Sequence, residues 1–184
     1  MEKFFSDREI FADFVTRYYT DYEPGSLWIA EKGGEVIGYL TGCLDSRRYE
    51  RMMAWKIIPA VFVKAVGRGV FFRKGTWRLL LQGIRMFLRG GFRSGVSLKE
   101  YPAHLHIDLS RDARGQGAGR SLMDRFVGQV RRTGLRGVHL VTRDDNKTAC
   151  RFFEQAGFKP VSRLPMVQTG SDPSSCRLIY GMKL

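Results

Sequence analysis

The stretch HLHIDLSRDARGQGAGRSLMDRFVGQVRR, residues 104–132, decides the fold. It begins with HLHIDL, in which histidine and aspartate alternate with leucine and isoleucine, as in a β-strand with one apolar face. It ends with GRSLMDRFVGQVRR, whose apolar residues recur at helical spacing. The glycine-rich loop RGQGAG, residues 114–119, joins the two. The stretch therefore predicts a strand, a tight loop and a helix in succession.

This loop is suited to holding an anion. Glycine tolerates a positive φ and lets a ligand approach the main chain. Backbone amides in such a turn, together with the positive end of the following helix dipole, attract phosphate groups. A P-loop is excluded because GxxxxGK[ST] is missing, and a GxGxxG pattern read from Gly115 would need its third glycine at Arg120. A turn that binds nothing is the alternative.

Apolar periodicity predicts further elements on both sides of this stretch. Asn146 begins one of the helices and Gly157 ends it. Two strand–loop–helix units in succession imply an α/β sheet with helices packed against it. The expected elements are a helix over about 7–22, strands over 26–32 and 33–44, a strand over 137–143, a helix over 146–157, and strands over 158–164 and 176–184.

Composition excludes several classes of protein. The 184 residues are 43% hydrophobic and 27% charged, which is typical of a folded domain and not of a disordered chain. The three cysteines are an odd number without CxxC spacing, so we expect no disulfide framework and no thiolate zinc site. The first residues lack a signal-peptide pattern and no run of 18 apolar residues occurs. We therefore expect a cytoplasmic protein with no membrane span.

In their order along the chain, the motifs resemble those of the GNAT superfamily of N-acetyltransferases. The family's cofactor motif, [RQ]xxGx[GA], is matched by Arg114, Gly117 and Gly119, and it follows a strand as it does in the family. Farther along, the family has a helix that begins with asparagine and ends in Gly-Phe, as the helix from Asn146 to Gly157-Phe158 does. The resemblance covers residues 26–44 and 101–184.

The resemblance implies a GNAT-type α/β fold with a mixed, mostly antiparallel central sheet flanked by helices. It also implies a single acyltransferase domain over residues 1–184. This chain departs from the family at two places. The family's first strand is missing or abbreviated, because the chain opens with a helix. We expect residues 46–98 to form a helical basic insertion, which is longer than the usual link between the family's third and fourth strands.

The resemblance further implies transfer of an acetyl group from acetyl-CoA, the co-substrate, to an amine by direct attack on the thioester, without a metal. In the family, loop amides hold the pyrophosphate, main chain at the end of the preceding strand pairs with the pantetheine arm, and the helix-capping asparagine contacts that arm. The cofactor-binding residues expected here are Asp108, Leu109, Ser110, Arg114, Gly115, Gln116, Gly117, Ala118, Gly119, Arg120, Asn146 and Phe153.

The family's usual general acid is absent. It is a tyrosine seven residues after the capping asparagine, where this chain has Phe153. A thiol pKa near ~8.5 lets the thiolate leave without an acid, so activity is still expected. The alternative is a non-catalytic acyl-CoA-binding module whose basic insertion docks on an anionic partner. A distant similarity to the acetyltransferase-like domain of O-GlcNAcases points to that alternative.

His104, His106 and Asp108 are the candidate catalytic residues. They alternate along one strand and therefore share a face. The His-x-His pair is similar to that of the arylalkylamine N-acetyltransferases, where it helps to relay the amine proton outward, a task that suits the pKa of histidine. Two alternatives are a pair of hydrogen-bonded structural histidines and an HxHxD metal site without visible further ligands. We expect His139 to be structural and Cys150 to be a small core residue.

The positive charge of the chain lies mostly in the insertion. The net charge is +13, and residues 47–93 hold twelve Lys and Arg against one acid, Glu50. Three roles for the insertion are open. It could be a helical lid with solvated arginines, or it could attract CoA phosphates or an anionic acceptor electrostatically. The third role is a docking surface for acidic lipid or nucleic acid. We expect a small-molecule or protein amine as partner and no specific nucleic acid, since no such motif occurs. The sequence does not identify the acceptor, and it does not decide whether the chain forms a homodimer.

Overall fold

A six-stranded sheet organises the protein in the computed structural model, which describes residues 8–69, 95–165 and 176–184. The strand order is β1-β2-β3-β4-β6-β5, and only β3 and β4 run parallel. This is the mixed, mostly antiparallel α/β fold that the resemblance implied. The strands are β1 Leu27–Lys32, β2 Glu35–Cys43, β3 Ala103–Leu109, β4 Gly137–Arg143, β5 Lys159–Pro165 and β6 Cys176–Lys183.

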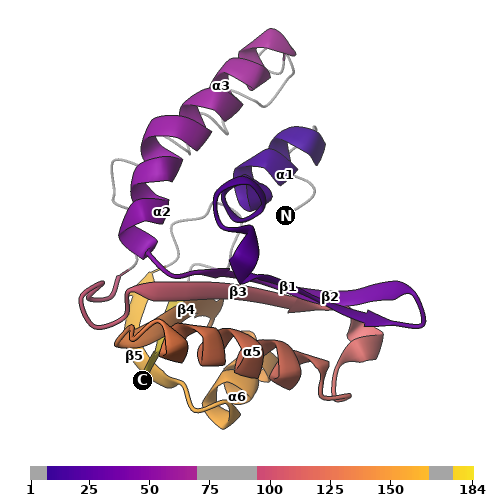
Figure 1. The fold of residues 1–184 in the computed structure, drawn as a ribbon, viewed down its shortest axis with the longest axis vertical. Coiled ribbons are helices and arrows are strands. Elements are labelled where there is room, and N and C mark those ends of the chain that lie inside the picture. Colours follow the sequence, from indigo (N-terminus) through magenta and orange to yellow (C-terminus); the bar gives the residue numbers. More distant parts are fainter. Residues whose placement is uncertain (1–7, 70–94, 166–175) are drawn as a thin grey trace.

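Helices cover both faces of the sheet (Figure 1). One face carries α5 and α6, and the other carries α1 together with α2 and α3. The helices are α1 Arg8–Arg17, α2 Ser46–Met52, α3 Ile58–Gly67, α5 Ala118–Arg132 and α6 Lys147–Gln155, with π-helical turns at Tyr18–Tyr22 and Met53–Ile57 and 3₁₀ turns at Pro24–Ser26 and Arg111–Ala113.

The main core lies between the sheet and α5. One side of α5 is apolar at helical spacing, and its residues Leu122, Phe126 and Val130 are all buried there. The helix lies so close to β2 that a Cβ at Gly42 would come within 2.1 Å of the Phe126 ring. Glycine at this position therefore lets a large aromatic ring fill the space directly over the strand.

Most of the predicted elements are confirmed. The strand over 137–143 agrees residue for residue, and the helix over about 7–22 is α1 continued by a π-helical turn. The insertion is helical over 46–67, where α2, a π-helical turn and α3 follow one another. The rest of the predicted helical insertion includes residues 70–94, which lie outside the described residues.

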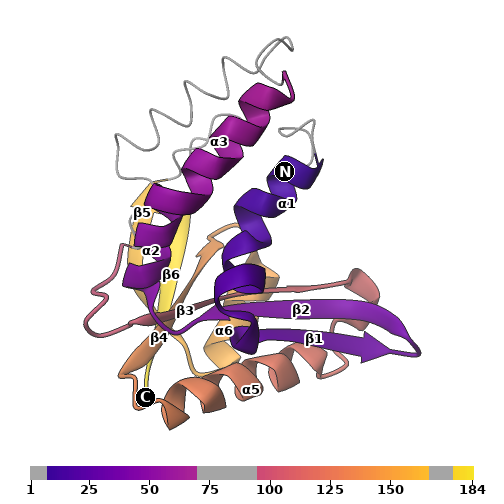
Figure 2. The same ribbon diagram turned by 45° about the horizontal axis from the view of Figure 1, so that its top comes forward.

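Residues 46–67, which we call the helical arm, project from the sheet beside α1 (Figures 1 and 2). The ammonium group of Lys64 lies 2.6 Å from a carboxylate oxygen of Glu9 and 2.5 Å from one of Asp13, and Arg68 also pairs with Glu9. These hydrogen bonds raise the pKa of Lys64. The inner face of the arm is therefore joined to α1 by charge as well as by packing.

A cluster of polar rings joins the base of the arm to the sheet. In His104 on β3, Nε2 lies 3.0 Å from the hydroxyl of Tyr19, and Nδ1 lies 2.7 Å from the hydroxyl of Ser46 at the start of α2. The ring of Tyr49 meets the imidazole edge-on at 4.7 Å. Burial, helped by the neighbouring His139, lowers the pKa of His104 to about 3, so this imidazole is neutral in the folded protein.

We expect His104→Asn to lower the free energy of unfolding at pH 7.5 by about 1–3 kcal/mol, because one hydroxyl in the cluster loses its partner. The difference in the free energy of unfolding between wild type and variant should become smaller as the pH falls. As the pH falls below about 6.5, the unfolded wild type takes up a proton on this imidazole that the folded protein refuses, so its stability falls down toward pH 3. The asparagine variant lacks this loss.

Urea unfolding at pH 7.5 and pH 5 measures both effects. A gap that stays constant between the two pH values would show that His104 is not held neutral by its surroundings.

Candidate functional site

The loop between β3 and α5 presents a row of backbone N–H groups. After Leu109, a 3₁₀ turn leads to Gly115 and Gly117, whose φ angles of +76° and +83° favour glycine. Within the part of the chain that the structure describes, no protein acceptor takes a hydrogen bond from the amides of residues 115–120. The first hydrogen bond of α5 runs from the Ser121 amide to the Gly117 carbonyl, at 3.0 Å. These donors are therefore available to a ligand.

The glycines of the loop have two different functions. A Cβ added at Gly115 or Gly117 would meet nothing within 4 Å, so the loop is open on that side. A Cβ at Gly119 would approach Leu109 to 2.7 Å and the ring of Phe152 to 3.3 Å, so this glycine lets the start of α5 pack closely. An open loop with free amides at the positive end of a 15-residue helix is an anion site.

Two side chains of the loop hold it in place. The amide of Gln116 accepts from the Lys32 ammonium at 2.7 Å and donates to the carbonyl of Asp112 at 2.5 Å. Arg120 donates through Nε to the Asp124 carboxylate at 2.9 Å and reaches the Gln155 carbonyl at 3.3 Å. These bonds tie the loop to the β1–β2 hairpin and to the end of α6.

Beside the loop, β3 and β4 separate. Their parallel ladder pairs only Ala103 with Val138 and His104 with His139, although β3 continues to Leu109. On their outer sides the two strands stay paired, β3 with β2 through residue 109 and β4 with β6 through residue 143. Beyond the ladder, the described residues of the two facing edges do not pair with each other, although at the end of β3 the Leu109 amide donates to the Asp108 carboxylate at 2.9 Å and the Leu109 carbonyl accepts from Arg114 at 3.5 Å. We call these facing edges the slot, and their backbone groups can pair with an extended ligand.

The predicted catalytic residues share one face of β3, as expected, but lie in two environments. Leu105 is buried in the main core, while His106 and Asp108 are exposed on the opposite face. Partial burial lowers the pKa of His106, and the Asp108 carboxylate opposes that shift. The Tyr39 ring lies 6.3 Å from that of His106. His104 belongs instead to the polar cluster at the base of the arm.

The two predicted cofactor contacts at α6 also lie in different environments. Asn146 is exposed and caps α6, since its side-chain oxygen accepts from the Ala149 amide at 3.2 Å. Phe153 is only 6% exposed, and its ring packs beside those of Phe158 and Tyr180 at 6.3 and 6.1 Å. Asn146 is therefore accessible to a ligand, whereas Phe153 lies in the core.

Two residues that we expected to be structural are buried. Nδ1 of His139 donates to the Tyr101 carbonyl at 3.0 Å, and Cys150 is 8% exposed, with its thiol 3.6 Å from the Arg143 carbonyl. In ranges 8–69, 95–165 and 176–184, no group of three His, Cys, Asp or Glu is placed to hold a metal ion. In the same ranges, every helix is too short or too polar to cross a bilayer.

Sequence reasoning did not identify the slot or the Lys32–Gln116 bridge. No residue type marks the point where two strands separate, because the separation depends on which partner each strand keeps on its other side. The bridge joins residues 84 positions apart, and nothing local indicates it.

Comparison with known proteins is consistent with this geometry. A model described as the acetyltransferase (GNAT) family matches residues 85–158, which include β3, the loop, α5, β4 and α6. Mycothiol acetyltransferase of Geodermatophilus obscurus is 40% identical over 52 residues, which are 28% of this chain and 17% of that protein. This chain therefore matches only a small part of that relative's length.

Solved structures match over nearly the whole chain. The crystal structure of SsHAT is 26% identical with a TM-score of 0.68, covering 98% of this chain and 83% of that one. That of yncA from Salmonella typhimurium, determined with its cofactor acetyl-CoA, is 16% identical with a TM-score of 0.52, covering 91% of this chain and 70% of that one. The finer likenesses to arylalkylamine N-acetyltransferases and O-GlcNAcase domains stay predictions. The family model thus matches 74 of the 184 residues, and the solved structures share the fold of nearly the whole chain.

Proposed function

We propose that this protein is an acetyl-CoA-dependent N-acyltransferase that acetylates an amine, with residues 1–184 acting as one acyltransferase domain. The observation that carries the proposal is the slot between β3 and β4, which opens beside the row of free amides at residues 115–120. A ligand that fits both features has an extended arm containing amides and, joined to it, a diphosphate. Coenzyme A has this construction.

The site residues would divide the coenzyme between them. The amides of residues 115–120 and the dipole of α5 would receive the diphosphate. The edge of β3 near Asp108–Ser110 would pair with the amides of the arm, as a neighbouring strand does, and Leu109 would exchange its bonds to Asp108 and Arg114 for bonds to the ligand. Asn146 has a side-chain NH₂ group left to donate, because only its oxygen is used in capping α6. The yncA structure, which has a similar fold, contains acetyl-CoA, and this supports the choice of coenzyme.

When bound, acetyl-CoA supplies a thioester carbonyl that an amine can attack. The new C–N bond forms as the C–S bond breaks, the thiolate leaves, and the amine loses a proton. We assign that proton to His106, since this side chain is exposed and its lowered pKa keeps it neutral at working pH. Asp108, on the same face, stabilises the imidazolium that results. Phe153 cannot protonate the thiolate, which therefore leaves unassisted.

The acceptor would enter on the face that carries α1 and the helical arm. His106 and Asp108 lie on this face of β3, and Val141 lies on the same face of β4, across the slot. Tyr39 extends the same surface on β2, where it pairs with Asp108. This surface combines one carboxylate with aromatic and aliphatic groups, which suits a protonated amine on an apolar body.

We expect Gly117→Glu to weaken CoA binding by at least about a hundredfold, because a carboxylate would stand against the diphosphate. The matched control is Gly134→Glu. Gly134 also has a positive φ, +70°, and nothing within 4 Å of its Cβ position, but it lies at the other end of α5. Isothermal titration with CoA compares the two. Equal affinity in both folded variants would refute the assignment of the loop.

We expect Asp108→Asn to shift the acidic limb of the kcat/KM profile to lower pH. Its carboxylate raises the pKa of His106, so removing the charge lets that pKa fall further, and the imidazole stays neutral in more acidic solution. His106→Gln should abolish the limb. A profile that is the same in wild type and His106→Gln would exclude His106 as the base.

Turnover itself is tested by thiol release from acetyl-CoA across a panel of amines, alongside direct CoA titration. We expect CoA to bind and at least one amine class, such as arylalkylamines, polyamines or peptide N-termini, to be acetylated. CoA binding without turnover on any amine would instead indicate a non-catalytic acyl-CoA-binding module. If CoA neither binds nor is turned over, the protein is neither this enzyme nor an acyl-CoA-binding module.

A further inference from the structure

The outer face of the helical arm carries apolar side chains that no part of the described protein covers. We define this face by Arg51, Trp55, Pro59, Val63 and Val66, which recur every three or four residues and so lie in one stripe along the arm. The side chains of Trp55, Val63 and Val66 are 81%, 69% and 51% exposed. An exposed apolar stripe of this length indicates a binding surface.

Basic residues border this stripe on the side of the sheet. These are Arg47, Arg48 and Arg51 on α2. Among residues with a described placement, none of the three forms an ion pair, whereas Lys56 turns toward α1 and lies 6.0 Å from the centroid of the Tyr22 ring. The outer face therefore keeps its positive charge.

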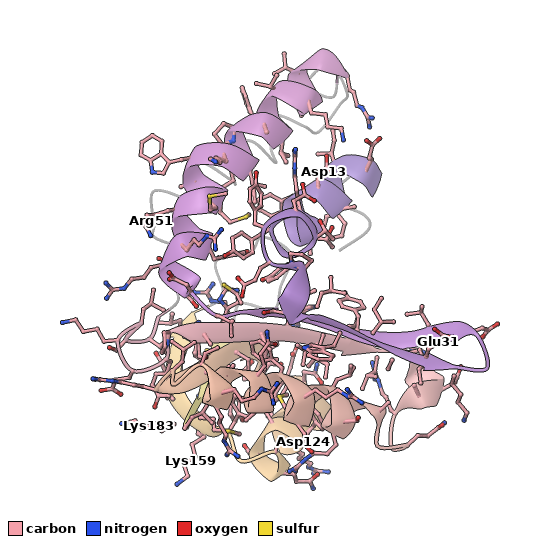
Figure 3. The ribbon with its side chains drawn as sticks, viewed as in Figure 1. Asp13, Glu31, Arg51, Asp124, Lys159 and Lys183 are labelled. Atoms are coloured by element: carbon pink, nitrogen blue, oxygen red, sulfur yellow. The ribbon has the colours of Figure 1, made fainter. Side chains whose placement is uncertain are left out.

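The inner face of the arm is different, because its charges are neutralised. Lys64 pairs there with the carboxylates of Glu9 and Asp13 on α1, and Arg68, just after the end of the arm, also pairs with Glu9. Figure 3 shows the same division: Asp13 lies on α1, which faces the inner side of the arm, and Arg51 lies on the side of the arm that faces away from α1. The arm is thus amphipathic in an unusual sense, with a neutralised inner face and an outer face that is both basic and apolar.

We propose that the outer face of the arm docks on the surface of an anionic lipid bilayer. Acidic headgroups would neutralise the bases of α2, and the side chains of Pro59, Val63 and Val66 would leave water for the boundary of the acyl chains. Trp55 lies between the basic and the aliphatic parts, which is where indole rings concentrate at membrane surfaces. From Arg51 to Val66 the stripe spans roughly 22 Å, enough for an interfacial helix but not for a span.

The aliphatic part of the stripe favours lipid over nucleic acid. Valine and proline side chains neither bind phosphate nor stack on bases, so Val63 and Val66 would gain nothing from a nucleic-acid strand. The arm exposes two aromatic rings, Trp55 and Phe62, and bases stacked on them would leave the exposed valines unused. A lipid surface uses every residue of the stripe.

Co-sedimentation of the full chain with vesicles tests the proposal. We expect binding to phosphatidylcholine vesicles that contain phosphatidylglycerol, and none to phosphatidylcholine alone. Replacing Arg47, Arg48 and Arg51 with serine should weaken binding about a hundredfold, since each base near an anionic surface contributes about a factor of five. Trp55→Ser with Val63→Ser should weaken it at least about tenfold, because the apolar side chains no longer leave water.

The matched control is Val36→Ser. Val36 is 63% exposed at the far end of the β1–β2 hairpin, so its loss should leave vesicle binding unchanged. Thermal unfolding of every variant checks that the fold is kept. In wild type, the tryptophan emission should also shift to shorter wavelength on binding, and most of that shift should be absent in Trp55→Phe.

Three outcomes would overturn the proposal. The first is no binding to the anionic vesicles, and the second is binding that the Trp55 and Val63 substitutions do not weaken. The third is tighter binding of random-sequence RNA or DNA that displaces the vesicles, which would assign the bases to nucleic acid. Gly117→Glu should bind vesicles like wild type, so a failure of the proposed acetyltransferase function would leave this result intact.

Discussion

The short ladder between β3 and β4 is the constraint on which the rest of the site depends. Each strand has a longer antiparallel partner on its outer side, and these partners direct the two strands apart beyond His104 and His139. The approach to the ladder is tight, because a Cβ at Gly137 would lie 2.6 Å from the Glu100 carbonyl. The strands therefore meet closely at one end and open at the other, beside the glycine loop.

The histidines at this junction connect the sheet to the helices above it. His104 and His139 have ring centroids 5.7 Å apart, and burial lowers the pKa of both. Two neutral imidazoles can lie this close, whereas two charged ones would repel. His104 then binds hydroxyls from the turn after α1 and from the start of α2, so the polar cluster sets where the helical arm leaves the sheet.

Local patterns were enough to predict most elements of the fold. The strand over 137–143 and the helix that Asn146 caps depend on periodicity and capping within a few residues, which the sequence displays directly. The environment of His104 could not be predicted, because its partners Tyr19 and Ser46 lie 85 and 58 positions away. The burial of Phe153 likewise depends on Tyr180, from a different strand. Contacts between distant parts of the chain therefore decide which of two residues in similar local patterns is exposed.

The side chain of Gln116 gives the glycine loop a property that its glycines alone would not have. Gly115 and Gly117 make the loop open but add backbone freedom that any ligand would have to remove. The bonds of Gln116 to Lys32 and to the Asp112 carbonyl remove much of that freedom in advance. The conformational entropy of ordering the loop is thus lost during folding, and a ligand meets a preorganised surface.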